Sequence, residues 1–357
     1  MTDRKLASVQ KILEISPIEG ADRIEVATVL GWQCVVAKKD NFNVGDLVVY
    51  FEIDSILPNL PIFEFMKDRK FKVKTIKLRK QISQGLVMPL SILPEKKWKE
   101  GDDVTKILNV TKHDPQAEQE ERERNIKKSK LERWLNKQKW YRKLFPKKRE
   151  GFPNWIKKTD EDRIQLFPNY YYHWKDLKFI VTEKVDGQSL TVFLVRNKKF
   201  FSRNNIEFGV CSRNLRLNKP NNSSYWTVAK YAGLKEKLLQ IPFDKTIVLQ
   251  GEILGQGIQG NKYQIRGYDL YAFNLIVDGK NFYGAMAKEI LDEVGIKFVP
   301  ILEEDFSLLP TMQEMVNYAK GKSVLLDTLR EGLVMRNYEN NISFKVINPD
   351  FLLKNDV

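Results

Sequence analysis

Lys184 lies in the segment Glu183-Lys184-Val185-Asp186-Gly187, the residues of this sequence best suited to nucleophilic chemistry. An apolar segment precedes it and an Asp-Gly pair follows, which predicts a strand ending in a tight turn at the lip of a cleft. A lysine attacks only as the neutral amine, so positive neighbours or desolvation must lower its pKa. A metal ion and basic side chains would do so. Chance also produces Lys-x-Asp-Gly in unrelated chains, so the surrounding residues have to support this interpretation.

Five further clusters follow Lys184 along the chain. Each places charged or aromatic side chains in or beside a strand-like segment: Ser212-Arg213-Asn214, Leu249-Gln250-Gly251-Glu252, Tyr268-Asp269-Leu270-Tyr271-Ala272-Phe273, Arg330-Glu331-Gly332-Leu333-Val334 and Ser343-Phe344-Lys345-Val346. Taken singly, these acids are ordinary strand-end charges and the aromatics are ordinary core residues. Their joint order points to one site.

In this order the clusters resemble the motifs of covalent nucleotidyltransferases, the superfamily of ligases and capping enzymes. The Ser-Arg-Asn element, the segment 251–261 and an amino-terminal barrel resemble the fifth family of ATP-dependent RNA ligases, in which an OB module comes first. DNA ligases and capping enzymes place their OB domain after the last motif. The resemblance covers most of the chain.

The resemblance implies that Lys184 attacks the α-phosphorus of ATP to form lysyl-AMP. AMP then passes to an RNA 5′-phosphate, and a 3′-hydroxyl displaces it to seal the strands, as in RNA end repair. Further implied roles in binding ATP are ribose contact by Glu252, adenine stacking by Tyr271 or Phe273, and cover of the other adenine face by Leu333 or Val334. Glu183 belongs to the same nucleotide-binding set.

The remaining implied roles concern phosphate and metal. Glu331 and Asp186 would coordinate Mg²⁺ or Mn²⁺, Lys345 would contact the α-phosphate as a catalytic residue, and Arg163 would reach the ATP phosphates. Arg213 is the preferred arginine of the Ser-Arg-Asn element.

Two assignments stay open. A second Ser-Arg-Asn at 202–204 makes Arg203 the alternative to Arg213, and the partner lysine of Lys345 is either Lys354 or absent. The same lysine could serve a DNA ligase or a capping guanylyltransferase, and the chain could instead be a non-catalytic RNA-binding protein. Gly255 to Gly260 fits a dinucleotide fingerprint, but no helix pattern follows it, so we expect a substrate-side loop.

The elements that position these residues form two domains. Residues 1–110 read as short strands of an all-β OB-like barrel, with an SH3-like barrel as the alternative. We expect strands at 12–15, 24–30, 33–37, 47–52, 73–78 and 86–89. Within them, residues 70–80 alternate lysines with apolar residues, which predicts a strand with one cationic face.

Residues 111–150 form a basic linker, with thirteen Lys or Arg against two Glu between Arg122 and Arg149. Near-helical spacing of Leu131, Trp134, Leu135, Tyr141 and Phe145 predicts an amphipathic helix, and cations interleaved with aromatics favour RNA contact.

Residues 151–357 have an α+β pattern, and the resemblance implies a nucleotidyltransferase domain of the ATP-grasp-like ligase type with antiparallel sheets. We expect strands at 179–183, 190–195, 247–254, 268–276, 332–336 and 342–346. Helices are expected at 223–239, 287–294 and 312–320.

The composition is that of a globular protein, and its charge and cysteine content bear on its partner and compartment. The net charge is +14 and the pI near 9.4, which favours a polyanionic partner. No apolar run reaches the length of a membrane span, the amino-terminal residues lack a signal segment, and two cysteines suit a reducing compartment. We expect a monomer in the cytoplasm or nucleus.

Overall fold

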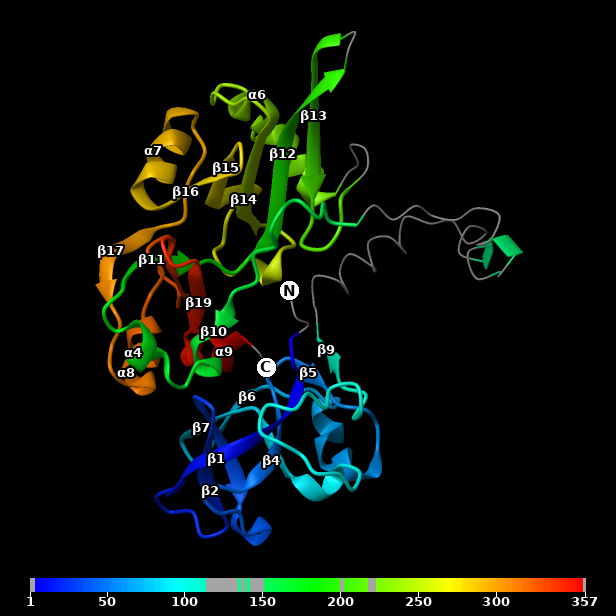
Figure 1. The fold of residues 1–357 in the computed structure, drawn as a ribbon, viewed down its shortest axis with the longest axis vertical. Helices are drawn as coiled ribbons and strands as arrows, with labels where there is room; N and C mark the ends of the chain where they lie inside the picture. The colour runs from blue at the N-terminus through cyan, green and yellow to red at the C-terminus, as the bar shows by residue number, and fades with distance from the viewer. Residues whose placement is uncertain are drawn as a thin grey trace.

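The structure is a computed structural model that describes residues 4–113, 134–135, 138, 140–141, 151–199, 202–217 and 223–355. These residues contain three five-stranded sheets and two short strand pairs. One sheet forms an N-terminal module, and the other two form a larger C-terminal lobe (Figure 1). The fold class is the predicted one, an OB-like module followed by an α+β domain with mainly antiparallel sheets.

The N-terminal module is a curved antiparallel sheet in which one long strand pairs on both sides. Its spatial order is β3 (Trp32–Ala37), β2 (Ile24–Val29), β1 (Ala7–Pro17), β4 (Leu47–Phe51) and β8 (Leu86–Pro89). The first half of β1 pairs with β4 and the second half with β2, and the register shifts between Ile12 and Glu14. Because such an irregularity bends and twists a strand, β1 curves the sheet toward a half-barrel.

Short elements complete the module. β5 (Ser55–Ile56) pairs with β9 (Thr111–Lys112), and β6 (Thr75–Leu78) pairs with β7 (Gln81–Gln84). The 3-10 helices are η1 (Lys38–Asp40), η2 (Pro61–Arg69) and η3 (Leu90–Ile92).

The prediction of one alternating strand over residues 70–80 is wrong. Only 75–78 is a strand, because Lys70 and Phe71 take the left-handed backbone conformation that ends η2, with φ of 52° and 58°. Arg79 and Lys80 also have positive φ and form the turn into β7. The lysines of this segment therefore do not share one strand face.

The C-terminal lobe holds two sheets. The first has the order β10 (Asp162–Arg163), β19 (Ile342–Ile347), β18 (Gly332–Asn337), β11 (Lys178–Lys184) and β17 (Ile301–Ser307), and only its β10–β19 pair is parallel. The second has the order β13 (Ser202–Cys211), β12 (Gln188–Lys199), β14 (Thr246–Gly255), β15 (Tyr268–Val277) and β16 (Lys280–Phe282).

Helices flank these sheets. They are α4 (Tyr170–Trp174), α5 (Ser224–Tyr231), α6 (Leu234–Leu238), α7 (Gly284–Glu293), α8 (Met312–Ala319) and α9 (Pro349–Asn355), with 3-10 turns η4 (Ile164–Leu166) and η5 (Gln259–Asn261). The single helix predicted over 223–239 is two helices, because Gly233 interrupts it with φ 61°.

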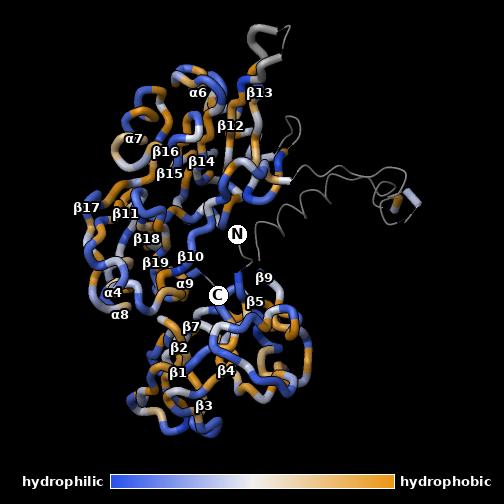
Figure 2. The backbone as a smooth tube through the Cα atoms, viewed as in Figure 1, coloured by the Kyte–Doolittle hydropathy of each residue, from blue (hydrophilic) through white to orange (hydrophobic). Residues whose placement is uncertain are grey.

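In Figure 2 the hydrophobic stretches follow the strands, whereas the chain around β10 is mostly hydrophilic.

The end of β19 and helix α9 join the two parts of the molecule. Ile347, Phe351 and Leu352 are buried in the same hydrophobic cluster as the N-terminal strands. The amide of Gly31 also donates to the carbonyl of Gln165, at 2.8 Å. The OB-like module is therefore packed against the C-terminal sheet, while the boundaries at 110 and 150 stay predictions.

The predicted linker helix falls mostly on residues outside the described ranges. Of the aromatic residues of the linker, Trp134, Trp140 and Tyr141 are described, and both tryptophans are more than half exposed. No helix in the described parts of the chain is long and apolar enough to cross a membrane.

Replacing Phe351 by Ala should lower the free energy of unfolding by about 3–5 kcal/mol, the usual cost of removing a buried aromatic side chain. Phe351 is only 4% exposed in the cluster that α9 shares with the N-terminal strands. Phe65→Ala is the matched control, because Phe65 is 59% exposed. Urea unfolding should show a much larger loss for Phe351→Ala, and equal losses would contradict a shared core.

Candidate active site

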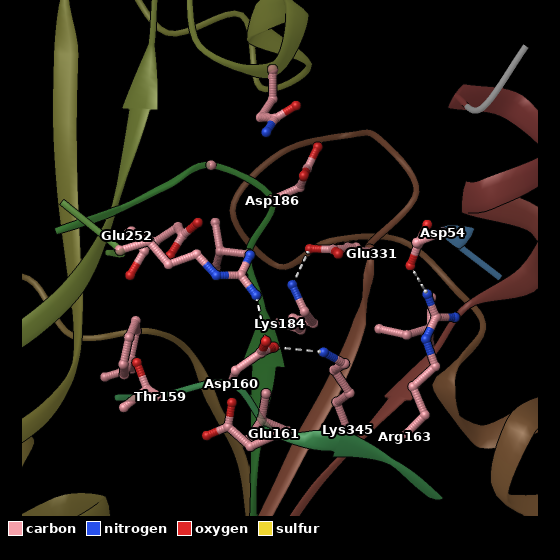
Figure 3. Close-up of a pocket in the computed structure, with 18 of the residues that line it drawn as sticks. Asp54, Thr159, Asp160, Glu161, Arg163, Lys184, Asp186, Glu252, Glu331 and Lys345 are labelled. Atoms are coloured by element: carbon pink, nitrogen blue, oxygen red, sulfur yellow. Dashed lines mark hydrogen bonds and ion pairs between the residues drawn. The ribbon is translucent and has the colours of Figure 1, made fainter. Parts of the chain in front are cut away.

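The residues predicted to do chemistry line one cavity of about 470 Å³. Lys184 is the last residue of β11, Glu331 immediately precedes β18, and Lys345 lies in β19 (Figure 3). Glu252 projects from β14 in the second sheet. The cavity also takes residues from the N-terminal module: Arg4, Asp54, Lys72, Val73, Lys74, Lys112 and His113.

Strand register explains which residues reach the cavity. Lys184 pairs with Gly332, and Val334 pairs with Lys345. Side chains alternate along a strand, so Val334 faces the cavity while Leu333 points the other way. Leu333 is fully buried in the hydrophobic core, and of the two residues expected to cover adenine only Val334 lines the cavity.

Two glycines let the strands meet closely enough to form this cavity. A Cβ on Gly187 would overlap the carbonyl oxygen of Ile253 in β14, and a Cβ on Gly332 would overlap that of Val346 in β19. Any larger residue would push these strands apart. The Asp-Gly and Glu-Gly pairs of the sequence are thus needed where carboxylates approach Lys184.

Carboxylates surround Lys184. Its amine donates to Glu331 Oε2 at 2.6 Å. Although burial acts to lower the pKa of Lys184, the charges of Glu331, Glu252 and Asp186 raise it above its ordinary value. The amine is therefore held protonated in the chain alone, and the lowering of its pKa by a metal ion and basic side chains stays a prediction.

The pKa values of Asp186 and Glu252 are also raised in this crowded group of carboxylates. Burial, followed by the charge of Glu331, raises the pKa of Asp186 to about 6, even though Lys262 donates to its Oδ2 at 2.5 Å. Burial also raises the pKa of Glu252 to about 8. These carboxyl groups therefore favour a cation that would relieve their mutual repulsion.

The opposite side of the cavity gathers cations around Asp160. Its carboxylate accepts from Arg213 at 2.5 Å, from Lys345 at 3.3 Å and from Lys112 at 3.4 Å. Burial acts to raise the pKa of Asp160, but Lys345, Arg213 and Lys112 together bring it well below its usual range. Burial is also the main reason that the pKa of Lys345 falls to about 8. A negative group here is strongly favoured.

Arg163 extends this cationic side toward the N-terminal module. Its Nη2 lies 3.3 Å from Asp54 Oδ2, and its guanidinium lies over the ring of Trp32. Its buried Nε and Nη1 have no hydrogen-bond partner. Arg163 lines the cavity, and a shift of its side chain would bring these two donors to an incoming phosphate oxygen.

Of the other predicted residues, some line the cavity and others do not. Phe273 lines the cavity, whereas Tyr271 does not and instead lies beneath Lys297. Glu183 accepts from the amide of Val324 through Oε2, and its buried Oε1 has no partner. Lys354 does not line the cavity. Arg203 lies in β13, but its side chain is outside the described part of the structure.

Sequence reasoning missed several charged residues of the cavity, among them Lys262, Asp160 and Lys112. Lys262 follows the glycine-rich loop that we interpreted only as substrate-side. Asp160 meets Lys345 because β10 pairs in parallel with β19, and no local pattern indicates this pairing. Lys112 reaches Asp160 from β9 of the N-terminal module.

Two carboxylates of the cavity are suited to hold a divalent metal ion. In the described ranges, no group of three or more His, Cys, Asp or Glu side chains could hold one. Asp186 and Glu331 nevertheless both line the cavity, each neutralised by a lysine. Mg²⁺ commonly binds through one or two carboxylates together with substrate phosphates, so this pair fits a metal that arrives with a nucleotide.

Comparison with known proteins decides the family. An OB-fold domain model matches residues 6–90, and an RNA ligase model matches residues 177–347. An RNA ligase mutant of Naegleria gruberi with AMP and Mn is 31% identical, with 99% of each chain covered and a TM-score of 0.80. The chain belongs to the RNA ligase family.

Two further structures of the Naegleria gruberi RNA ligase extend the likeness over 99% of both chains. One, with PPi, is 32% identical with a TM-score of 0.79, and a mutant with ATP and Mn is 31% identical with the same TM-score. Comparison with curated proteins gave no match. This RNA ligase therefore has the OB-first order that we expected, and the OB alternative is the right one for its N-terminal module.

Replacing Glu331 by Gln should move deprotonation of Lys184 to lower pH. The charge of Glu331 is the largest influence that raises this pKa, and without it the opposing effect of burial weighs more. Acetylation of Lys184, followed by mass spectrometry across a pH series without nucleotide or metal, measures the midpoint. Glu293→Gln, an exposed substitution in α7, should leave it unchanged. An unchanged midpoint in Glu331→Gln would contradict the assigned electrostatics.

Proposed function

We propose that this chain joins RNA 3′-hydroxyl and 5′-phosphate ends with ATP through lysyl-AMP and RNA-adenylate intermediates. The observation that carries the proposal is the division of one cavity into two sides. Carboxylates surround the amine of Lys184, and cations surround Asp160. The first side suits a nucleophile and a divalent cation, and the second suits phosphate oxygens.

The proposed chemistry has three phosphoryl transfers. The neutral amine of Lys184 attacks the α-phosphorus of ATP, a P–N bond forms, and the bond to the pyrophosphate oxygen breaks. An RNA 5′-phosphate oxygen next attacks this phosphorus and breaks the P–N bond. A 3′-hydroxyl finally loses its proton and attacks the RNA 5′-phosphate, and AMP leaves. Such reactions depend mainly on positioning and on charge neutralisation.

Asp186 and Glu331 would hold Mg²⁺ or Mn²⁺. A bound divalent cation supplies positive charge to the carboxylates and the phosphates. With Glu331 neutralised, burial and Lys345 both favour the unprotonated amine of Lys184. Lys345 and Arg213 would leave Asp160 for the α-phosphate region, and Arg163 would use its unpaired Nε and Nη1 for another phosphate oxygen.

The adenine end of the cavity supports ATP over GTP. Phe273, Val334 and Val299 provide apolar walls. Glu183 Oε1 is a buried acceptor without a partner, and the 6-amino group of adenine can donate to it, whereas guanine presents a carbonyl there. This argues against a capping guanylyltransferase. Glu252 would hold the ribose hydroxyls.

The physiological setting is part of the proposal. The solved relatives with ATP, AMP and Mn agree with the expected cofactors. We propose that the enzyme repairs broken RNA inside the cell and works as a monomer. The free, buried Cys34 and Cys211 are compatible with a reducing compartment.

Replacing Lys184 by Ala should abolish joining of a 5′-phosphorylated RNA, because it removes the amine that is proposed to carry AMP. Lys178→Ala is the matched control, since Lys178 lies at the exposed start of the same strand. A gel assay on single strands, nicked RNA duplexes, nicks with DNA on the 3′-hydroxyl side and nicked all-DNA duplexes measures joining. Sealing of DNA alone would favour a DNA ligase, and joining by Lys184→Ala would overturn the mechanism.

Glu183→Gln should reduce the preference for ATP over GTP in lysine nucleotidylation by tenfold or more. The amide of Val324 needs the remaining carbonyl oxygen, so the new NH₂ would face the base and oppose the adenine amino group. Labelling with radioactive ATP and GTP measures the ratio. Glu236→Gln, an exposed substitution in α6, is the control. An unchanged ratio in Glu183→Gln would remove Glu183 from base recognition.

A further inference from the structure

A second cavity opens beside the nucleotide site, between the N-terminal module and the C-terminal lobe. Its volume is about 860 Å³. It shares part of its wall with the first cavity, including Arg4, Lys112, Asp160, Arg213 and Lys345. The second cavity therefore begins at the cations around Asp160 and continues away from Lys184. We refer to it as the interdomain groove.

The groove walls are polar and carry excess positive charge. Eight Lys or Arg residues line it, against five Asp or Glu residues. Three of the acids already have cationic partners: Glu52 pairs with Arg4, Glu161 with Arg336, and Asp160 with the cation cluster. A polyanion entering the groove thus meets cations in excess of the acids that could repel it.

Three lysines lie along the groove beyond the nucleotide cavity. Lys5, Lys106 and Lys158 line the groove but not the first cavity, and all three are exposed. The Lys5 amine donates to the carbonyl of Gly101 at 2.7 Å, and the Lys158 amine donates to Asn214 Oδ1 at 3.3 Å. These partners are neutral, so the charges of Lys5 and Lys158 stay available to phosphates.

The groove also offers an aromatic surface. Phe152 is partly exposed in its wall, and the Lys158 amine lies 5.7 Å from the centre of its ring. The first half of β1, with Ser8 and Gln10, also lines the groove. A positive channel with an aromatic face is how many proteins hold a single nucleic-acid strand, and OB modules commonly contribute to such channels.

We propose that the interdomain groove holds the 5′-phosphorylated RNA strand, with its terminal phosphate at the Arg213, Lys345 and Lys112 cluster and its following nucleotides along Lys106, Lys158 and Phe152. This inference rests on the proposed function and names where its RNA substrate binds. The strand has to present its 5′-phosphate beside lysyl-AMP, and the groove leads to that point. The terminal phosphate would lie beside the α-phosphate of lysyl-AMP, on the side from which pyrophosphate has left, because the cations that hold the α-phosphate also line the groove.

The test separates the ATP step from the RNA step. A Lys106→Ala/Lys158→Ala double variant is compared with Lys39→Ala/Lys235→Ala, which removes two exposed lysines that line neither cavity. The full chain is used throughout. Lysyl-AMP formation is measured with labelled ATP and Mg²⁺. AMP transfer from the preformed enzyme adenylate to a 5′-phosphorylated oligoribonucleotide is then measured at subsaturating RNA.

In the groove variant, Lys106→Ala/Lys158→Ala, we expect lysyl-AMP formation within twofold of the unmodified chain. We expect AMP transfer to be slower by about tenfold. Equilibrium binding of the same oligoribonucleotide should depend less on salt. The slope of the logarithm of the binding constant against the logarithm of the salt concentration should be smaller by about 1.4, for two phosphate contacts at roughly 0.7 each. The control variant should match the unmodified chain in all three measurements. Normal lysyl-AMP formation also shows that the groove variant is folded.

Three results would overturn the groove assignment. Equal loss of AMP transfer in both variants would show a general effect of charge. Unchanged AMP transfer and RNA binding in the groove variant would place the strand elsewhere. Equal loss of lysyl-AMP formation and AMP transfer would assign the groove to ATP. Failure of the unmodified chain to form lysyl-AMP would instead overturn the proposed function.

Discussion

The ion pair between Lys184 and Glu331 is the interaction on which the site depends. In the chain alone it neutralises a lysine among three carboxylates and keeps the amine protonated. Asp160 has the opposite arrangement, a carboxylate among cations. On each side of the cavity, one side chain of opposite sign therefore neutralises its neighbours. A ligand has to take the place of that charge: of Lys184 on the carboxylate side and of Asp160 on the cationic side. A cation at the carboxylates and phosphates at the cations would together release the nucleophile.

The fold supports this balance by bringing strand ends together. β11, β18 and β19 present Lys184, Glu331 and Lys345 from adjacent positions in one sheet. Gly187 and Gly332 remove the side chains that would separate the strands. Helix α9 follows β19 directly and is buried with the N-terminal strands, so the OB-like module is attached next to the phosphate side of the cavity.

Sequence patterns predict the elements that have strong local signals. The strands that carry the motifs, and helices α7 and α8, lie where apolar periodicity places them. Contacts set by tertiary structure could not be predicted. The sequence gives no reason to prefer Leu333 or Val334 as the residue that covers adenine. Only the strand face to which each belongs shows that Val334 lines the cavity and Leu333 lies in the core. The pairing of Asp160 with Lys345 depends on a two-residue parallel strand, and the raised pKa of Lys184 depends on acids from three separate segments.

Peptide mapping of the adenylylated protein tests the central claim most directly. The chain is incubated with labelled ATP and Mg²⁺, digested, and the labelled residue identified by mass spectrometry. AMP should be bound through a P–N bond to Lys184 alone, and added pyrophosphate should discharge it. Label on another lysine, or stable binding of ATP without any covalent AMP, would contradict the role of Lys184 and of the carboxylates around it.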